Sequence, residues 1–172
     1  NYTKALLAVA GIKSCYTIIT SDINRISLDK DFFSMTGNHI ILNVPLPDDT
    51  IWLECTSQNM AYNMVTPGTH DRDALAIAEN DSYIVHTPAL NANTNKKKNV
   101  STIQIFPNGD ISGKLLSSYN GYNYQLTFEE VGLTEVEFRK ELVEELDEFQ
   151  ELKILNTSRR NDKETGVYTR EL

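Results

Sequence analysis

Apolar and polar residues alternate over several short stretches of this chain. Such alternation over four to eight residues is typical of a β-strand with one buried face. The strand-like stretches are 13–20, 39–45 with 50–56, 74–78 with 83–87, the residues flanking the Asn-Gly turn at 108–109, 153–157 and 167–169. The pattern therefore predicts a chain built mainly from antiparallel strands and hairpins.

Two stretches depart from this alternation and predict helices. Residues 2–10 place apolar side chains on one side, and Gly11 is a natural residue to end a helix. Thr134 followed by Glu137 is the capping-box pattern, and the helix that it opens is expected to reach about Leu152. Because single helices separate runs of strands without βαβ alternation, the sequence predicts an α+β fold.

A boundary between two domains is expected after residue 88, where the apolar content falls sharply. Residues 89–98 are rich in Asn and Lys and are expected to form a solvated linker. This divides the chain into a first domain, 1–88, and a small β-rich domain with one long helix, 99–172. Within the first domain, residues 21–37 show no sustained period and are expected to form a long loop.

Composition narrows the classes of function. The chain has 172 residues, 40% hydrophobic and 23% charged, as in globular proteins. Its net charge of −8 makes nucleic acid an unexpected partner, and no apolar run reaches the roughly 20 residues of a membrane span. Since the chain begins without Met and inside a helical pattern, we expect it to be a piece of a longer or processed protein.

Cys15 and Cys55 each lie in an apolar, strand-like run. We expect two buried free thiols, and the alternative is a disulfide between them if the protein is exported. Neither is expected to act as a nucleophile, because neither stands at a helix N-terminus or beside a histidine, the settings that favour a reactive thiolate.

The hairpin at residues 39–56 carries the main candidate chemistry. If its turn holds an even number of residues, His39 and Glu54 share one face, roughly 5 to 8 Å apart. Trp52 and Thr56 share this face too. A carboxylate in an apolar strand needs a partner, and beside an imidazole it fixes the tautomer that a general base requires. The alternative is a histidine with a purely structural role.

Other residues were weighed as binding positions. Asn38, next to His39, and Trp52 are candidate substrate-cleft residues; for Trp52 the core is the favoured role, and a wall of the cleft is the alternative. His70 is interpreted as part of a solvated loop, and the alternative is a metal cluster with His39 in a metal-dependent hydrolase. His86 is expected on an edge strand. Packing is the favoured role, and sugar or peptide stacking the alternative, for Tyr119, Tyr122 and Tyr124.

The hairpin motif resembles the transglutaminase-like branch of the papain-type fold. In that family a Cys at a helix N-terminus is followed by a His-bearing strand and, usually 15 residues after the His, by an acidic residue with a nearby Thr. Here Glu54 lies 15 residues after His39, and Thr56 follows. The stretches "AGIKSCYTIIT", "NHIILNVPLPDDTIWLECTSQ" and "HDRDALAI" resemble bacterial envelope members with a small C-terminal domain, whereas 89–172 match more loosely.

The resemblance implies that residues 1–88 form the C-terminal half of a papain-like core, with a helix and an antiparallel sheet. His39 would be the general base and Glu54, in place of the commoner Asp, its orienting group. The nucleophilic Cys is expected a few residues before Asn1, where a helix dipole would stabilise its thiolate. The chain alone is therefore expected to be inactive.

The resemblance also implies a function and a location. The parent protein would be a thiol enzyme acting on amide bonds, as a protease, amidase or acyl transferase, in the periplasm or at the cell surface. Its substrate would be a protein or peptide, and no cofactor or metal is expected. The alternative is a non-catalytic binding or scaffolding module of the bacterial envelope. Self-association through exposed core surface is a further expectation.

Overall fold

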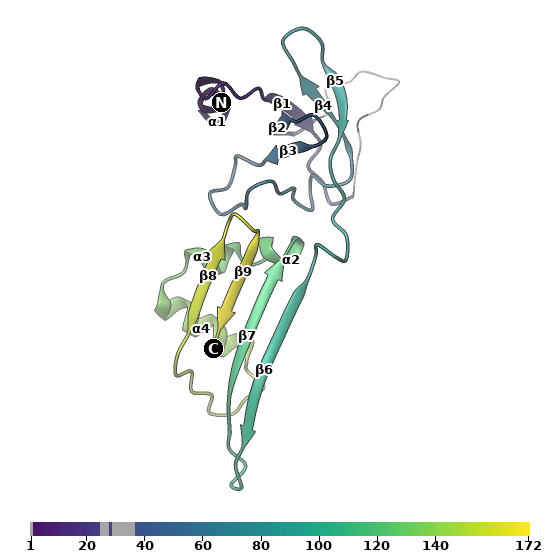
Figure 1. Cartoon of the computed structure of the whole chain (residues 1–172). Coiled ribbons are helices and arrows are strands. Elements are labelled where there is room, and N and C mark those ends of the chain that lie inside the picture. The colour runs from purple at the N-terminus through teal and green to yellow at the C-terminus, as the bar shows by residue number, and fades with distance from the viewer. Residues whose placement is uncertain (1, 25–27, 29–36) are drawn as a thin grey trace. The chain divides into compact units, whose positions relative to one another are not determined.

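The computed structural model describes residues 2–24, 28 and 37–172, and it divides the chain into two compact units (Figure 1). Unit 1 is Asn1–Asn91 and unit 2 is Ala92–Leu172. Each described unit combines an antiparallel sheet with helices, so the fold is α+β, as predicted. Most of the expected loop at 21–37 lies outside the described residues.

Unit 1 is built on a five-stranded antiparallel sheet with the strand order β3-β2-β1-β4-β5. Its described elements are α1 (Tyr2–Val9), β1 (Cys15–Ile19), β2 (His39–Pro45), β3 (Thr50–Leu53), β4 (Asp73–Ile77) and β5 (Tyr83–His86). The two predicted hairpins of this unit are confirmed as β2–β3 and β4–β5.

Gly11 ends α1, as the sequence predicted. Its φ of 73° is left-handed, a conformation that glycine adopts without a steric penalty. The Gly11 N–H donates to the Ala8 carbonyl at 3.0 Å, and the Ile12 N–H donates to the Leu7 carbonyl at 2.8 Å. These two bonds form a Schellman motif, which satisfies carbonyl groups at the helix end.

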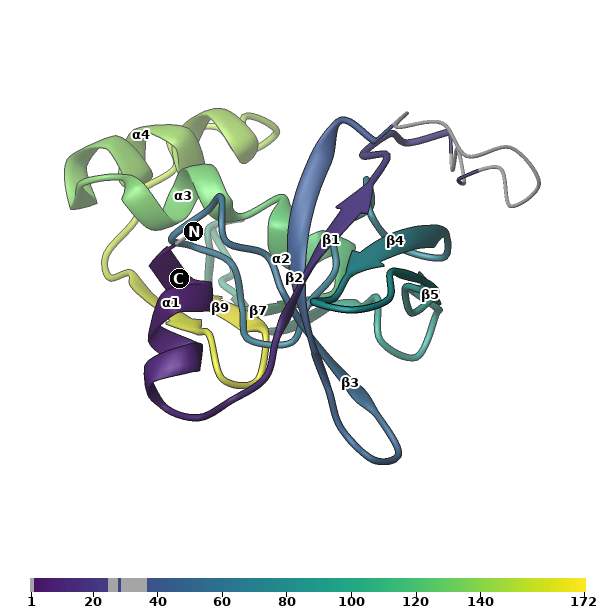
Figure 2. The same ribbon diagram turned by 90° about the horizontal axis from the view of Figure 1, so that it is seen from above.

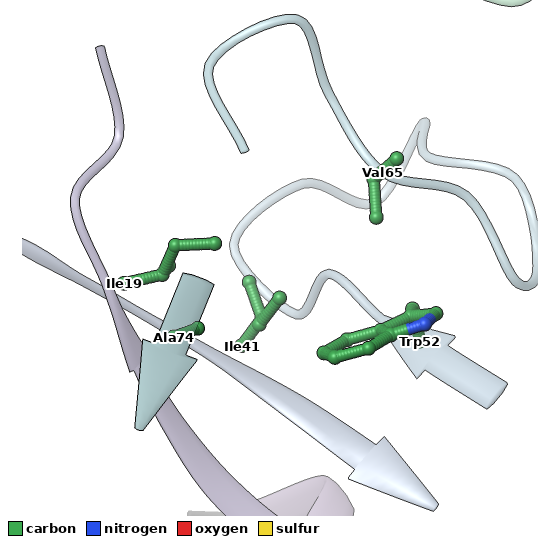
Figure 3. Packing of buried hydrophobic residues seen from close by; sticks show 5 residues of the cluster. All are labelled: Ile19, Ile41, Trp52, Val65 and Ala74. Carbon is green, nitrogen blue, oxygen red and sulfur yellow. The ribbon is translucent and has the colours of Figure 1, made fainter. Parts of the chain in front are cut away.

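One cluster of the core of unit 1 lies on a single face of the sheet. Figure 3 shows its side chains gathered there: Ile19, Ile41, Trp52, Val65 and Ala74. These residues come from four different strands and from the loop between β3 and β4, so the core depends on pairings between segments far apart in the chain.

Unit 2 is built on a four-stranded antiparallel sheet with the order β6-β7-β9-β8. Its described elements are β6 (Lys97–Ile105), β7 (Ile111–Asn120), α2 (Tyr122–Gln125), α3 (Phe128–Gly132), α4 (Glu135–Glu145), β8 (Ser158–Asp162) and β9 (Val167–Glu171). Figures 1 and 2 show α3 and α4 on one side of this sheet. Since β6 begins at Lys97, the last two residues of the expected linker at 89–98 belong to a strand.

The predicted capping box of α4 is confirmed, but the helix is shorter than expected. The Glu137 N–H donates to the Thr134 hydroxyl, and the Thr134 N–H donates to the Glu137 carboxylate at 2.8 Å. The helix ends at Glu145 instead of Leu152. Its last turn carries no basic residue, and acidic side chains around 144–148 are unfavourable at the negative end of a helix dipole.

The segment after α4 also differs from the prediction. Residues 153–157, expected as a strand, are irregular, and pairing begins with Ser158. Phe149, which falls within the range expected for the helix, is 51% exposed because α4 has already ended. Phe138 and Leu142, on α4 itself, are buried. The alternation of apolar and polar residues at 153–157 does not produce a strand, because no neighbouring strand pairs with these residues.

Tyrosine packing forms much of the core of unit 2. Tyr119, Tyr124 and Tyr168 are buried, and Tyr124 packs edge-on against Phe128 with ring centroids 5.3 Å apart. The Tyr124 hydroxyl donates to Asn161 Oδ1 at 2.7 Å. Packing is thus the observed environment of Tyr119 and Tyr124, whereas Tyr122 is 43% exposed.

Candidate functional site

His39 and Glu54 are hydrogen-bonded partners on one face of the β2–β3 hairpin. Asn43 pairs with Trp52 and Pro45 with Thr50, so the turn holds an even number of residues, as the parity argument required. The distance between His39 Nε2 and Glu54 Oε2 is 2.7 Å. The side chain of Glu54 is 4% exposed and that of His39 is 22% exposed.

Thr56 holds the second oxygen of the Glu54 carboxylate. Its N–H donates to Glu54 Oε1 at 3.1 Å, and its hydroxyl donates to the same oxygen at 2.7 Å. Both carboxylate oxygens therefore have partners, one in His39 and one in Thr56. This arrangement satisfies a nearly buried carboxylate and fixes its orientation toward the imidazole.

The contact assigns the tautomer of His39. An ionised carboxylate only accepts hydrogen bonds, so the proton of a neutral imidazole must lie on Nε2. Nδ1 then carries the lone pair, and among the described residues no group hydrogen-bonds to it. An imidazole held in this way can take a proton through Nδ1 while the carboxylate stabilises the resulting positive charge.

Asn38 positions the start of β2, and its side chain is engaged by the backbone. Its Oδ1 accepts from the Ser21 N–H at 2.7 Å, and its Nδ2 donates to the Ser21 carbonyl at 3.3 Å. The neighbouring Gly37 lies so close to β1 that an added Cβ would be 2.2 Å from a side-chain carbon of Ile18. These contacts fix the chain entering β2, immediately before His39.

Trp52 is a core residue, and its prediction as a wall of a substrate cleft is wrong. It shares the face of His39, as expected, but it is only 5% exposed and packs in the cluster with Ile41 and Val65. The loop after β3 covers this face and buries the indole (Figure 3). The parity of the hairpin correctly predicted the face on which Trp52 lies. It could not predict that the loop after β3 covers this face.

Cys15 does not lie beside His39. Cys15 is free and partly buried, and it pairs with Asn43, whereas His39 pairs with Ile19 at the other end of β1. Four residues of strand separate the two positions by about 13 Å. Cys55 is free and exposed, which corrects the expectation of a buried thiol, and its Sγ donates to the Leu53 carbonyl at 3.7 Å.

The other two histidines have different environments. His70 is buried, contrary to the expected solvated loop, and its Nδ1 accepts from the Leu90 N–H at 3.3 Å. His86 lies on the edge strand β5, as expected, and contacts Asp73 at 3.0 Å and Asp71 at 3.3 Å. The part of the chain that the structure describes contains no group of three or more His, Cys, Asp or Glu side chains suited to a metal ion.

A partly buried ionic cluster in unit 2 was not found by sequence reasoning. Arg170 on β9 bonds Glu130 at 3.2 Å and Glu145 at 2.6 Å, and the Tyr168 hydroxyl donates to Glu130 at 3.0 Å. Burial lowers the pKa of the Arg170 guanidinium, but the hydrogen bond to Glu145 and the charge of Glu130 outweigh burial and raise it. The only signal in the sequence was an arginine among alternating apolar residues near the C-terminus.

No described helix of this chain has the length and apolar character needed to cross a membrane. In comparisons with known proteins, no family model, curated protein or solved structure matches the chain. Its candidate site is therefore assessed on geometry, and the strongest geometry is that of His39, Glu54 and Thr56.

Proposed function

We propose that this chain supplies the general base and its orienting carboxylate to a thiol-dependent enzyme that acts on amide bonds. The observation that supports this proposal is the 2.7 Å contact from His39 Nε2 to Glu54, which leaves Nδ1 without a described partner. His39 would accept the thiol proton through Nδ1, and the thiolate would attack the carbonyl carbon of an amide. The imidazolium would then protonate the leaving amine.

In this proposal the nucleophile comes from a segment before Asn1. The sequence resemblance supports this source, and the position of Cys15, at the other end of β1 from the partner of His39, leaves it unsuited to serve His39. A transglutaminase-like core, a protein or peptide substrate and a periplasmic or cell-surface location belong to the same proposal. Release of the acyl group to water would give hydrolysis, and release to an amine would give acyl transfer.

The proposal can be tested on a protein whose natural chain continues upstream of Asn1. Alkylation by iodoacetamide, followed across pH by mass spectrometry, should find one cysteine that reacts at acidic pH, where ordinary thiols are protonated. His39→Ala should shift that reaction to the pH of an ordinary thiol, and Glu54→Gln should shift it part of the way. His86→Ala, which changes an exposed histidine elsewhere in the sheet, is the matched control and should leave the profile unchanged.

Two results would contradict the proposal. One is the absence of any acid-reactive cysteine, and the other is a reactive cysteine that His39→Ala leaves unaffected. Either result would favour a non-catalytic binding or scaffolding module of the envelope. The observation that favours this second function is the separation of Cys15 from the imidazole, since Cys15 and His39 lie at opposite ends of the β1–β2 pairing.

A further inference from the structure

The hairpin of β6 and β7 extends beyond the rest of its sheet (Figure 1). Strand β9 pairs with β7 only from Leu116 to Asn120, and a further backbone exchange joins Leu115 to Leu172. Residues 102–114, the hairpin arm, are therefore two strands and a turn without a third strand. Two-stranded ribbons are only marginally stable in water, so a long one gains stability when it finds a partner.

The two faces of the hairpin arm differ in polarity. Ile105 lies opposite Ile111, and Ile103 lies on the same face, because alternate residues of a strand share a face. These isoleucines are 73%, 56% and 60% exposed, in that order. The register continues this face into that of Tyr119 and Arg170, which the helices of unit 2 cover. Thus the core-facing side of the sheet continues along the arm without a helix over it.

The outer edge of β6 presents unpaired backbone groups. The Asn120 N–H donates to the Lys96 carbonyl and the Phe106 N–H to the Asp110 carbonyl, each at 2.9 Å. Even-numbered residues of β6 therefore direct their backbone groups to β7, and odd-numbered residues direct theirs outward. The outward residues are Lys97, Asn99, Ser101, Ile103 and Ile105. All nine residues of β6 are exposed, and none is a proline, which would block pairing along this edge.

The distribution of charge along the hairpin favours antiparallel pairing with β6 of a second copy of this chain. Lys96, Lys97 and Lys98 stand at its base, Asp110 stands at its tip, and residues 99–109 are uncharged. Two copies of β6 paired in antiparallel fashion bring the lysines of each copy beside the aspartate of the other. A parallel pairing would place lysines against lysines. The other free edge of this sheet, β8, is shorter and carries two arginines, so it repels the lysines of β6.

We propose that the β6 edge is a self-association surface that pairs with β6 of a second copy of this chain, antiparallel and centred on Ser101. In this register Ser101 lies opposite Ser101, and Lys97 lies opposite Ile105 of the second copy. The alkyl stem of Lys97 then covers part of the exposed isoleucine. Because this pairing covers the β6 edge of both copies, assembly stops at a dimer and does not continue into a fibre.

Sedimentation velocity of the full chain over a range of concentrations tests this pairing. We expect a reversible dimer that weakens as salt is added. Salt screens the attraction between the lysines at the base of one hairpin and Asp110 at the tip of the other. Ser101→Pro removes an outward N–H and no bond to β7, so it should weaken dimerisation about tenfold or more. Ser101→Ala keeps that N–H and is the matched control. A monomer at every concentration, oligomers beyond the dimer, or equal effects of the two variants would overturn the proposal.

A crosslinking experiment tests the register even if the proline variant fails to fold. Ser101→Cys should form a disulfide between copies under mild oxidation, identified by mass spectrometry as a link between the two residues 101. Ile105→Cys is the control, because in this register the two residues 105 lie about 26 Å apart. Rapid linkage of Ile105→Cys, or no linkage of Ser101→Cys, would overturn the antiparallel pairing centred on Ser101.

Discussion

Two charged clusters of this protein, one in each unit, contrast in which polar groups they leave accessible. In unit 2, Arg170 lies between two carboxylates, and its side chain is 6% exposed. It joins β9 to the helices that carry Glu130 and Glu145. In unit 1, Glu54 is equally enclosed, but its partner His39 keeps 22% of its side chain exposed and one ring nitrogen without a described partner.

This difference shows how a charged cluster that mainly stabilises the fold can be distinguished from one that is suited to proton transfer. The partners of Arg170 come from elements that must stay together, so the cluster is directed inward. In the other cluster the carboxylate is fixed by Thr56 and by the histidine, and the histidine directs its remaining nitrogen away from the pair. A group held on one side and accessible on the other is what proton transfer requires.

The largest expected effect tests the structural cluster. Arg170→Ala leaves Glu130 and Glu145 without their cation in a partly buried site, and should lower the free energy of unfolding of unit 2 by about 3–5 kcal/mol. Urea unfolding followed by far-UV circular dichroism measures it, and Trp52, the only tryptophan, reports unit 1 separately. Arg160→Ala, at a side chain 77% exposed, is the control and should change stability by less than about 0.5 kcal/mol.

A smaller loss is expected when His39 is removed. His39→Ala leaves Glu54 with Thr56 as its remaining partner, so unfolding of unit 1 should become easier by about 1–2 kcal/mol. Urea unfolding followed by Trp52 fluorescence measures this change. A loss of stability as large as that of Arg170→Ala would mean that the two clusters stabilise the fold to the same extent. The contrast between them would then be contradicted.

Thr56→Val tests the orientation of the carboxylate with a side chain of similar shape. It removes the hydroxyl donor to Glu54 Oε1 and keeps the backbone N–H donor. We expect a loss of about 1 kcal/mol and a weaker His39–Glu54 hydrogen bond. Nitrogen chemical shifts of the imidazole would report that weakening. Unchanged shifts would show that the hydroxyl has no part in orienting the pair.

The smallest effect concerns the exposed histidine. The hydrogen bond that His86 donates to the Asp73 carboxylate outweighs the effect of burial and raises the pKa of His86 above its ordinary 6.5. The ion pair therefore adds stability in full below pH 6.5, and this contribution is lost as the pH rises through the raised pKa. Because the site is exposed, the contribution should stay under about 1 kcal/mol.

His86→Gln measures this contribution. The variant should be less stable than the parent at about pH 5.5 and equally stable at about pH 8.5. The titration of the His86 ring, followed by NMR, gives the pKa directly. A stability difference that grows with rising pH would contradict the ion pair.

The sequence by itself predicted most of the local elements and, given the length of its turn, the parity of the main hairpin. Alternation gave the strands except at 153–157, Gly11 and Thr134 marked helix ends, and a turn with an even number of residues placed His39 and Glu54 on one face. These features depend on backbone geometry within a few residues, where spacing and residue type are sufficient.

Only the tertiary structure decided which surfaces are covered. It placed Trp52 in a core closed by a distant loop, buried His70, and used the amide of Asn38 to hold Ser21. It also joined Arg170 to carboxylates on α3 and α4 and left the hairpin arm uncovered. The physical reason is that burial depends on which distant segments pack together, and a local pattern of apolar residues is compatible with many such packings.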